Sequence, residues 1–144
     1  MKGCVVDASV AVKWLVDEKY SKEASDLLAG GTTLLAPELL FAEVTNALWA
    51  MCRRGDIDRD ALADAVALLR KAPVATPVPM RQLASAAARL SVDLDHPTYD
   101  CFYLALALHE QHPVTTADSR FLEKVREHPY LTDSIRHVAE DGAD

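Results

Sequence analysis

The chain has 144 residues, the length of one ordinary domain, and half of them are hydrophobic. Acidic residues outnumber basic ones, 22 to 15, and the resulting net charge of −7 argues against a general electrostatic grip on nucleic acid. The three cysteines are far apart and predict no disulfide framework, as in a reducing compartment. The longest apolar run, Cys101 to Leu108, is too short to cross a membrane. We therefore expect one soluble, cytoplasmic domain over residues 1–144, with no membrane contact and with an acidic tail that frays from about residue 139.

Short apolar strands alternate with helices along the whole sequence. The predicted strands are 3–7, 33–36, one short strand within 73–79, 113–116, and a last one within 131–144. The predicted helices are 9–16, 20–29, 37–53, 58–71, 80–90, 97–111 and 118–126. This alternation predicts an α/β fold, a three-layer α/β/α sandwich around a central, mainly parallel sheet.

Two acidic residues stand directly behind predicted strands. Asp7 follows the apolar run Cys4-Val5-Val6, and Asp118 follows the strand that ends at Thr116. In open α/β sheets, ligands bind outside the carboxyl ends of the strands. We therefore expect both carboxylates to lie at the edge of the sheet where a functional site would form.

Two further acidic residues lie inside strongly apolar helical segments. Glu43 belongs to LLFAEVTNALW and Asp100 to PTYDCFYLALAL, and no basic residue is close to either one in sequence. A buried carboxylate without a partner must take up a proton, pair with a cation or coordinate a metal. Several such acids favour a divalent cation with oxygen ligands, Mg²⁺ or Mn²⁺, which suits phosphodiester hydrolysis.

Each carboxylate taken alone also has a structural explanation. Asp7 and Asp118 could cap the helices that follow them, because Asp is a favoured N-cap residue. Asp100, in a first helical turn, could interact with the helix dipole. Glu43 is the hardest to explain in this way, because an apolar helix gains nothing from it. All four together favour one shared site, while the capping explanations stay open for the single residues.

Other familiar site patterns are missing from the sequence. It contains neither a glycine-rich phosphate-binding motif nor a GxSxG nucleophile turn, and its five histidines include no HExxH pair. Phosphoaspartate hydrolases need Asp-x-Asp after the first strand, but here the second position is Ser9. These absences disfavour nucleotide-binding, serine hydrolase, zinc protease and phosphoaspartate chemistry.

Four segments of the sequence together resemble the motifs of the PIN domain family, and within it the small VapC-type toxins of prokaryotic toxin–antitoxin pairs. The segments are VVDASVAVKWLV, APELLFAEVTNAL, HPTYDCFYLALA and TTADSRF, and they extend roughly from Val5 to Phe121. In this resemblance the acidic positions of the family fall on Asp7, Glu43, Asp100 and Asp118, and its polar companions fall on Ser9, Asn46 and Thr116.

The resemblance implies an endoribonuclease that depends on Mg²⁺ or Mn²⁺. Asp7 and Asp100 would hold the metal, and Glu43 would be a further ligand or would position the attacking water. Asp118 would act from farther out or at a second metal position, while Ser9 and Thr116 would orient carboxylates by hydrogen bonds. The expected products carry a 5′-phosphate and a 3′-hydroxyl.

The resemblance also implies partners: an RNA substrate, a cognate VapB-like antitoxin that lays a basic segment across the acidic groove, and a second copy of the chain in a homodimer. Contact with RNA would come from local basic residues such as Lys13, Arg53 or Arg120. Two alternatives stay open, a PIN nuclease that processes RNA without a toxin role and a catalytically silent PIN binding module. All four acids are present, which argues against the silent module.

Overall fold

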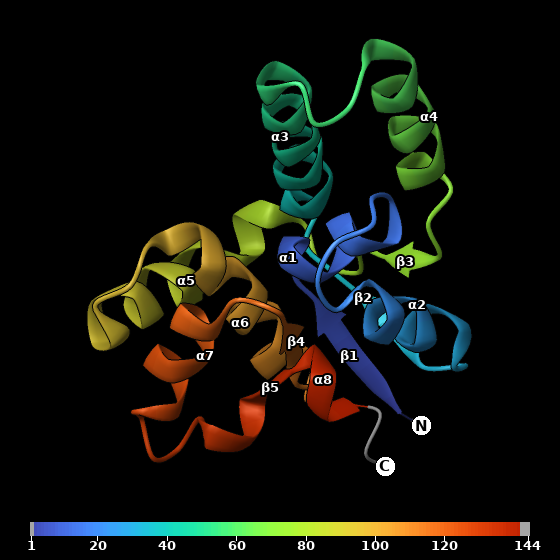
Figure 1. Ribbon diagram of the computed structural model, residues 1–144. Coiled ribbons are helices and arrows are strands. Elements are labelled where there is room, and N and C mark those ends of the chain that lie inside the picture. Colours follow the sequence, from blue (N-terminus) through green and yellow to red (C-terminus); the bar gives the residue numbers. More distant parts are fainter. Residues whose placement is uncertain (1, 142–144) are drawn as a thin grey trace.

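Five short strands form one sheet in which every neighbouring pair is parallel. In this computed structural model, which describes residues 2–141, the order across the sheet is β3-β2-β1-β4-β5 (Figure 1). The strands are β1 (Gly3–Val6), β2 (Thr33–Leu35), β3 (Val74–Ala75), β4 (Val114–Thr116) and β5 (Ile135–His137). The predicted α/β fold with a mainly parallel central sheet is confirmed.

The first strand lies in the middle of the sheet. From β1 the chain adds β2 and β3 on one side, and it later adds β4 and β5 on the other. In the register, Val5 lies opposite Leu35 on β2 and opposite Val114 on β4. The winding therefore reverses between β1 and β4, and such a reversal opens a crevice at the carboxyl ends of the two strands. Asp7 and Asp118 both follow strands that end at this crevice.

Helices connect the strands and cover both faces of the sheet (Figure 1). They are α1 (Ala8–Ala11), the 3₁₀ turn η1 (Val12–Trp14), α2 (Ser21–Ala29), α3 (Leu39–Arg54), α4 (Arg59–Arg70), α5 (Met80–Leu94), α6 (Thr98–Glu110), α7 (Ser119–Arg126), the 3₁₀ turn η2 (Thr132–Ser134) and α8 (Val138–Asp141). None of the helices in the described range 2–141 combines the length and the apolar character needed to cross a membrane.

Two apolar cores lie on opposite faces of the sheet, because side chains alternate along a strand. Cys4 and Val6 belong to a small core that includes residues of α2 and α8. Val5 belongs to the large core, which includes residues of α3, α4, α5, α6 and α7. Helix α6 is the central element of the large core, and its residues from Tyr103 to Ala107 are all buried. This position explains why its sequence is apolar all round.

Two helical segments differ from the prediction at their ends. The helix expected over 9–16 is instead the short α1 followed by η1, because the Trp14 indole donates a hydrogen bond to the Ala24 carbonyl and turns the chain toward α2. Helix α5 continues to Leu94, a buried core residue, and ends where Asp95 takes a left-handed conformation. Residues 139–141 are part of α8, where Glu140 pairs with Arg126 at 2.9 Å. Residues 142–144 lie outside the described residues.

Candidate active site

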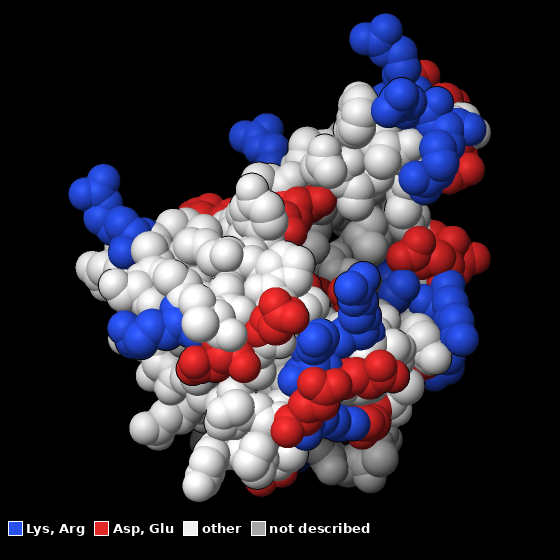
Figure 2. Space-filling model, turned by 90° about the vertical axis from the view of Figure 1, so that its left-hand side faces the viewer, with Lys and Arg blue, Asp and Glu red and all other residues white. Residues whose placement is uncertain are grey.

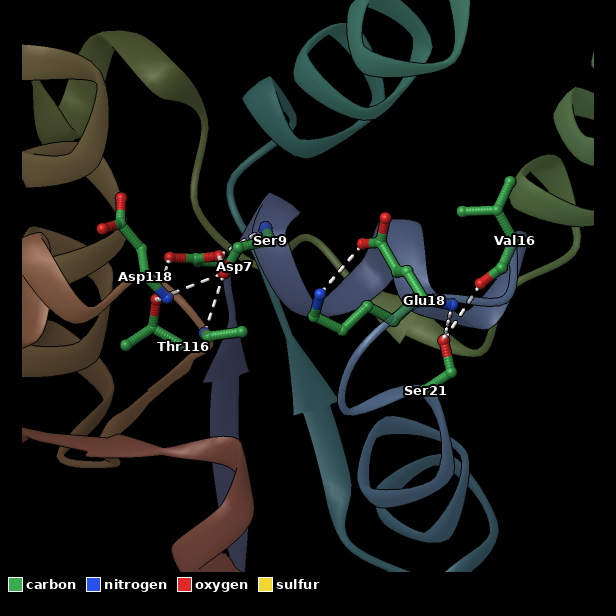
Figure 3. Close-up of polar contacts among 9 residues, drawn as sticks. Asp7, Ser9, Val16, Glu18, Ser21, Thr116 and Asp118 are labelled. Atoms are coloured by element: carbon green, nitrogen blue, oxygen red, sulfur yellow. Dashed lines mark hydrogen bonds and ion pairs between the residues drawn. The ribbon is translucent and has the colours of Figure 1, made fainter. Parts of the chain in front are cut away.

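Asp7 is a buried carboxylate at the carboxyl end of β1, and three donors hold it. Its Oδ1 accepts hydrogen bonds from the backbone N–H of Ser9 at 2.6 Å and from the Ser9 hydroxyl at 2.5 Å. Its Oδ2 accepts one from the Thr116 hydroxyl at 2.7 Å. Figure 3 shows these side chains together where β1 and β4 end. Asp7 thus caps α1, and it is also held by Thr116 at the end of β4.

The charge of Asp7 is poorly compensated. Burial is the main cause that raises its pKa from 3.8 to about 6, and the negative charge of Asp100 adds to the rise. The hydrogen bonds from Ser9 and Thr116 act in the opposite direction but do not cancel the effect of burial. Among the described residues no Lys, Arg or His forms an ion pair with Asp7. A cation bound at this carboxylate would remove the electrostatic penalty.

Ser9 and Thr116 join the two strand ends into one structure. The Ser9 hydroxyl accepts a hydrogen bond from the Ala117 backbone at 2.9 Å and lies 3.2 Å from the Thr116 hydroxyl. The Thr116 hydroxyl in turn accepts one from the Asp118 backbone at 3.0 Å. Both hydroxyls therefore act on the orientation of Asp7 and on the path of the chain after β4. The two predicted supporting residues, Ser9 and Thr116, thus contact each other where β1 and β4 end.

Asp118 caps helix α7. Its Oδ1 accepts hydrogen bonds from the backbone N–H groups of Arg120 at 3.0 Å and Phe121 at 3.2 Å. The same side chain acts on the site, because its negative charge raises the pKa of Asp100. Asp118 can therefore cap α7 and contribute charge to the site at the same time. The sequence alone could not distinguish between these two roles.

Asp100 lies in the first turn of α6 and contacts a buried histidine. Its Oδ2 lies 2.6 Å from Nε2 of His96, one helical turn earlier in the sequence. Burial raises the pKa of Asp100, the contact with His96 lowers it, and the charge of Asp118 raises it again. His96 does not stand out as a site residue in the sequence. The spacing of four residues between His96 and Asp100 at the start of a helix is a signal that could have identified the pair.

Glu43 lies in the second turn of α3 and is held by a tyrosine. The hydroxyl of Tyr103, a buried residue of α6, donates a 2.7 Å hydrogen bond to Glu43 Oε1. Burial raises the pKa of Glu43 most, the Tyr103 hydrogen bond lowers it, and the charge of Asp100 raises it. Burial beside Glu43 also raises the pKa of the Tyr103 hydroxyl strongly, so that it stays a donor. The sequence did not reveal this tyrosine, which its pattern assigns to the apolar core.

Asn46 lies one turn beyond Glu43 on α3 and is exposed. The two residues border a shallow cavity of about 340 Å³, together with Leu39, Ala42 and Tyr99. No hydrogen bond joins Asn46 to the other predicted site residues within the described part of the chain. The structure thus leaves Asn46 facing the space next to Glu43.

Asp100 connects the four acids electrostatically. Its charge raises the pKa of both Asp7 and Glu43, and its own pKa is raised by Asp118. Over residues 2–141, however, no three or more His, Cys, Asp or Glu side chains are gathered closely enough to enclose a metal ion. Mg²⁺ usually keeps several waters and binds proteins through one or two carboxylates. The buried carboxylate of Asp7 and the half-buried carboxylate of Asp100, whose pKa values are both raised, fit a cation of that kind better than one that needs a full protein cage.

Several basic residues form ion pairs with acidic residues other than the four predicted site acids. Lys13, expected as a possible RNA contact, pairs with Glu18 at 2.9 Å and is largely buried. Figure 2 shows Lys and Arg side chains gathered at the top of the molecule, which in Figure 1 is the outer end of α3 and α4. Arg53 and Arg54 close α3 at this end, and Arg54 pairs with Asp56.

Known proteins share both the sequence pattern and the fold. The PIN domain family model matches residues 4–127. The crystal structure of PAE2754 from Pyrobaculum aerophilum aligns with a TM-score of 0.67 and 22% identity, over 96% of this chain and 90% of that one. VapC20 from Mycobacterium tuberculosis, a toxin that cleaves the sarcin–ricin loop, aligns with a TM-score of 0.64 and 16% identity, over 83% of this chain and 92% of that one. No curated protein sequence matches significantly.

The family match covers most of the chain and includes all four acidic positions, Asp7, Glu43, Asp100 and Asp118. At identities of 22% and 16%, the two solved structures establish the common fold. They agree with the family match on the same parallel α/β architecture. The chain belongs to the PIN domain family, whose fold is generally that of a nuclease.

Proposed function

We propose that this PIN domain is a metal-dependent endoribonuclease that hydrolyses RNA phosphodiester bonds and serves as the toxin of a type II toxin–antitoxin pair. The observation that carries the proposal is the electrostatic state of the acids beside the β1–β4 crevice. Asp7, Glu43 and Asp100 come from three separate segments, and all have raised pKa values because burial outweighs their compensating contacts. Such clusters of perturbed groups in a crevice are typical of functional sites.

Asp7 and Asp100 would hold Mg²⁺ or Mn²⁺ in the proposed site. When bound, the metal supplies an activated water at neutral pH and neutralises charge on the phosphate. Ser9 and Thr116 keep the Asp7 oxygens in a fixed orientation, and Glu43, with its raised pKa, is suited to take a proton from the attacking water. Attack by water on phosphorus breaks the bond to the 3′-oxygen, which leaves and takes up a proton from solvent, so that the products carry a 5′-phosphate and a 3′-hydroxyl. Asp118 keeps the strand end in place and adds negative charge.

Two features support the toxin role and its partners. The family match and the common fold with VapC20, itself a toxin that cleaves an RNA loop, favour an RNA substrate. A VapB-like antitoxin with a basic segment fits an acidic crevice on a chain of net charge −7. The proposal includes a homodimer and a cytoplasmic location.

The test is cleavage of a quenched fluorescent RNA by purified protein, with Mg²⁺, with Mn²⁺ and with EDTA. Asp7→Asn is the inactive variant, and Asp64→Asn, an exposed carboxylate on α4, is the matched control. We expect cleavage only with a divalent metal, retained in Asp64→Asn and lost in Asp7→Asn. Equal cleavage by Asp7→Asn would contradict the proposed site and indicate a contaminating nuclease.

The toxin role needs a separate experiment. Induced expression of the chain should arrest bacterial growth, and co-expression of the reading frame next to its gene should restore growth if that frame encodes the antitoxin. Asp7→Asn should not arrest growth at equal protein level. Cleavage in vitro without growth arrest would favour the alternative of an RNA-processing nuclease.

A further inference from the structure

His96 is a buried histidine that faces a carboxylate of the proposed metal site. Its side chain is only 5% exposed, and Nε2 lies 2.6 Å from Asp100 Oδ2. A carboxylate that carries a charge can only accept a hydrogen bond, so Nε2 must carry the hydrogen in this pair. One oxygen of Asp100 is therefore engaged by the histidine, whereas Oδ1 accepts no hydrogen bond within residues 2–141 and is left for another ligand.

The imidazole ring of His96 also contacts helix α7, whose N-cap residue is Asp118. The ring stacks on Phe121 with a centroid distance of 5.2 Å and an interplanar angle of 10°. Phe121 is fully buried, and its backbone N–H donates to Asp118. His96 is thus held between Asp100, at the start of α6, and the first turn of α7. Its own backbone N–H is bound to the Ser91 carbonyl at 3.2 Å.

From this geometry we propose that His96 is a positioning residue, which holds the Asp100 carboxylate toward the crevice for a divalent cation. Asp100 has like-charged neighbours in Asp7, Glu43 and Asp118. Without a donor on Oδ2, repulsion among these groups would turn the carboxylate toward water. Hydrogen-bond partners that orient metal-binding carboxylates are typically worth 10- to 100-fold in metal affinity or activity. The inference rests on the proposed metal site and adds a residue to it.

Binding of Mn²⁺ alone, measured by isothermal titration calorimetry, tests the proposal without RNA. His96→Phe keeps an aromatic ring against Phe121 and removes the donor. His96→Gln places an amide N–H near the position of Nε2. His109→Phe, in the last turn of α6, is the matched control because His109 is exposed and is not among the site residues. We expect Mn²⁺ affinity about 10- to 100-fold lower in His96→Phe, largely restored in His96→Gln and unchanged in His109→Phe.

A folded His96→Phe protein that binds Mn²⁺ like the wild type would overturn the proposal. In Asp100→Asn, adding His96→Phe should not lower the affinity further, because His96 acts through Asp100; an additive loss would also contradict it. If His96→Phe does not fold, the nitrogen resonances of His96 in the labelled wild-type protein give the answer. They should shift when Mg²⁺ is added, and constant resonances at saturating Mg²⁺ would overturn the proposal.

The two proposals can fail separately. A wild-type protein that binds no Mn²⁺ would contradict the metal site on which both depend. Wild-type binding with no effect of His96→Phe would remove only the positioning role and leave the proposed nuclease intact.

Discussion

Thr116 donates a 2.7 Å hydrogen bond to Asp7, although 109 positions separate them in the sequence. The bond joins the end of β4 to the end of β1, the two neighbouring strands between which the winding of the sheet reverses. The Thr116 hydroxyl also accepts the backbone N–H of Asp118. One side chain therefore sets the position of the most buried acid and the direction of the chain that carries another.

Asp7→Asn should make the metal-free protein more stable at neutral pH. The pKa of Asp7 is about 6 in the folded protein and 3.8 in the reference state. Between these values the folded chain holds a proton that the unfolded chain has released, so the free energy of unfolding falls as pH rises from about 4 to 6. The shift corresponds to about 3 kcal/mol at higher pH. In EDTA at pH 7.5, we expect Asp7→Asn to unfold at higher urea concentration than the wild type.

The pH dependence supplies the internal control for this variant. Near pH 4 the wild-type Asp7 is protonated in the folded state, so the two proteins should have similar urea midpoints. A variant that is equally or less stable than wild type at both pH values would show that the buried charge is compensated in a way the structure does not reveal.

Divalent metal should stabilise the wild-type protein. A ligand that binds only the folded state adds about 2.7 kcal/mol at a concentration one hundred times its Kd. We expect Mg²⁺ to raise the melting temperature of the wild type and of the Asp64→Asn control, and to leave Asp7→Asn unchanged. The measurement is a thermal melt in MgCl₂ and in KCl of equal ionic strength. Equal effects of the two salts on the wild type would mean general screening and no specific site.

Two substitutions of Asp118 should separate helix capping from the role in the site. Asn can still cap α7, so Asp118→Asn should keep stability within about 0.5 kcal/mol, whereas Asp118→Ala should lose about 1 kcal/mol. Both remove the negative charge and should lower RNA cleavage. Urea titration and the cleavage assay measure the two effects.

A second cap in the same chain serves as the matched control for this pair. Asp58 caps α4 by accepting the Ala61 backbone N–H at 2.8 Å. Asp58→Ala should lose a similar amount of stability and keep full cleavage. If Asp118→Asn also cleaves at the wild-type rate, Asp118 is only a capping residue.

Tyr103→Phe should act through Glu43. It removes the only hydrogen bond that the structure gives the Glu43 carboxylate within the described residues. We expect a loss of about 1–2 kcal/mol in stability. Because the Tyr103 hydroxyl lowers the pKa of Glu43, its removal should raise that pKa and move the acidic limb of the pH–rate profile to higher pH.

Tyr130→Phe is the control for the loss of a hydroxyl, because Tyr130 is 88% exposed. It should leave both stability and the pH–rate profile unchanged. An unaltered acidic limb in a folded Tyr103→Phe protein would show that the protonation of Glu43 does not limit the reaction.

Much of the fold could be predicted because the strong local signals agree with the tertiary structure. Asp58 and Gly55 stand at helix ends, and the apolar strands are short and unbroken. The sequence pattern also directs attention to Asp7 and Asp118, since their position behind a strand is a local property. In the structure, both lie beside the same crevice.

The residues that the sequence did not reveal are those whose partners are defined by packing. In the sequence, Tyr103 fits the apolar pattern of α6 and is predicted to belong to the core. Its hydroxyl reaches Glu43 only because α3 packs next to α6 in the structure. The stacking of His96 on Phe121 likewise depends on how α7 folds back. The short α1 has the same origin, since the contact of Trp14 with α2 overrides a helical pattern that would have continued to Val16.

The central place of β1 has a consequence for the order in which the site is completed. The ribosome makes β1 and Asp7 before β4, the neighbouring strand that fixes Asp7 and whose Thr116 lies 109 positions further along the sequence. A nascent chain that stops before that point lacks Thr116 and Asp118, and its first strand has an unpaired edge. The incomplete polypeptide therefore cannot assemble the crevice. Any activity of the crevice can begin only after β4 has been synthesised and has paired with β1.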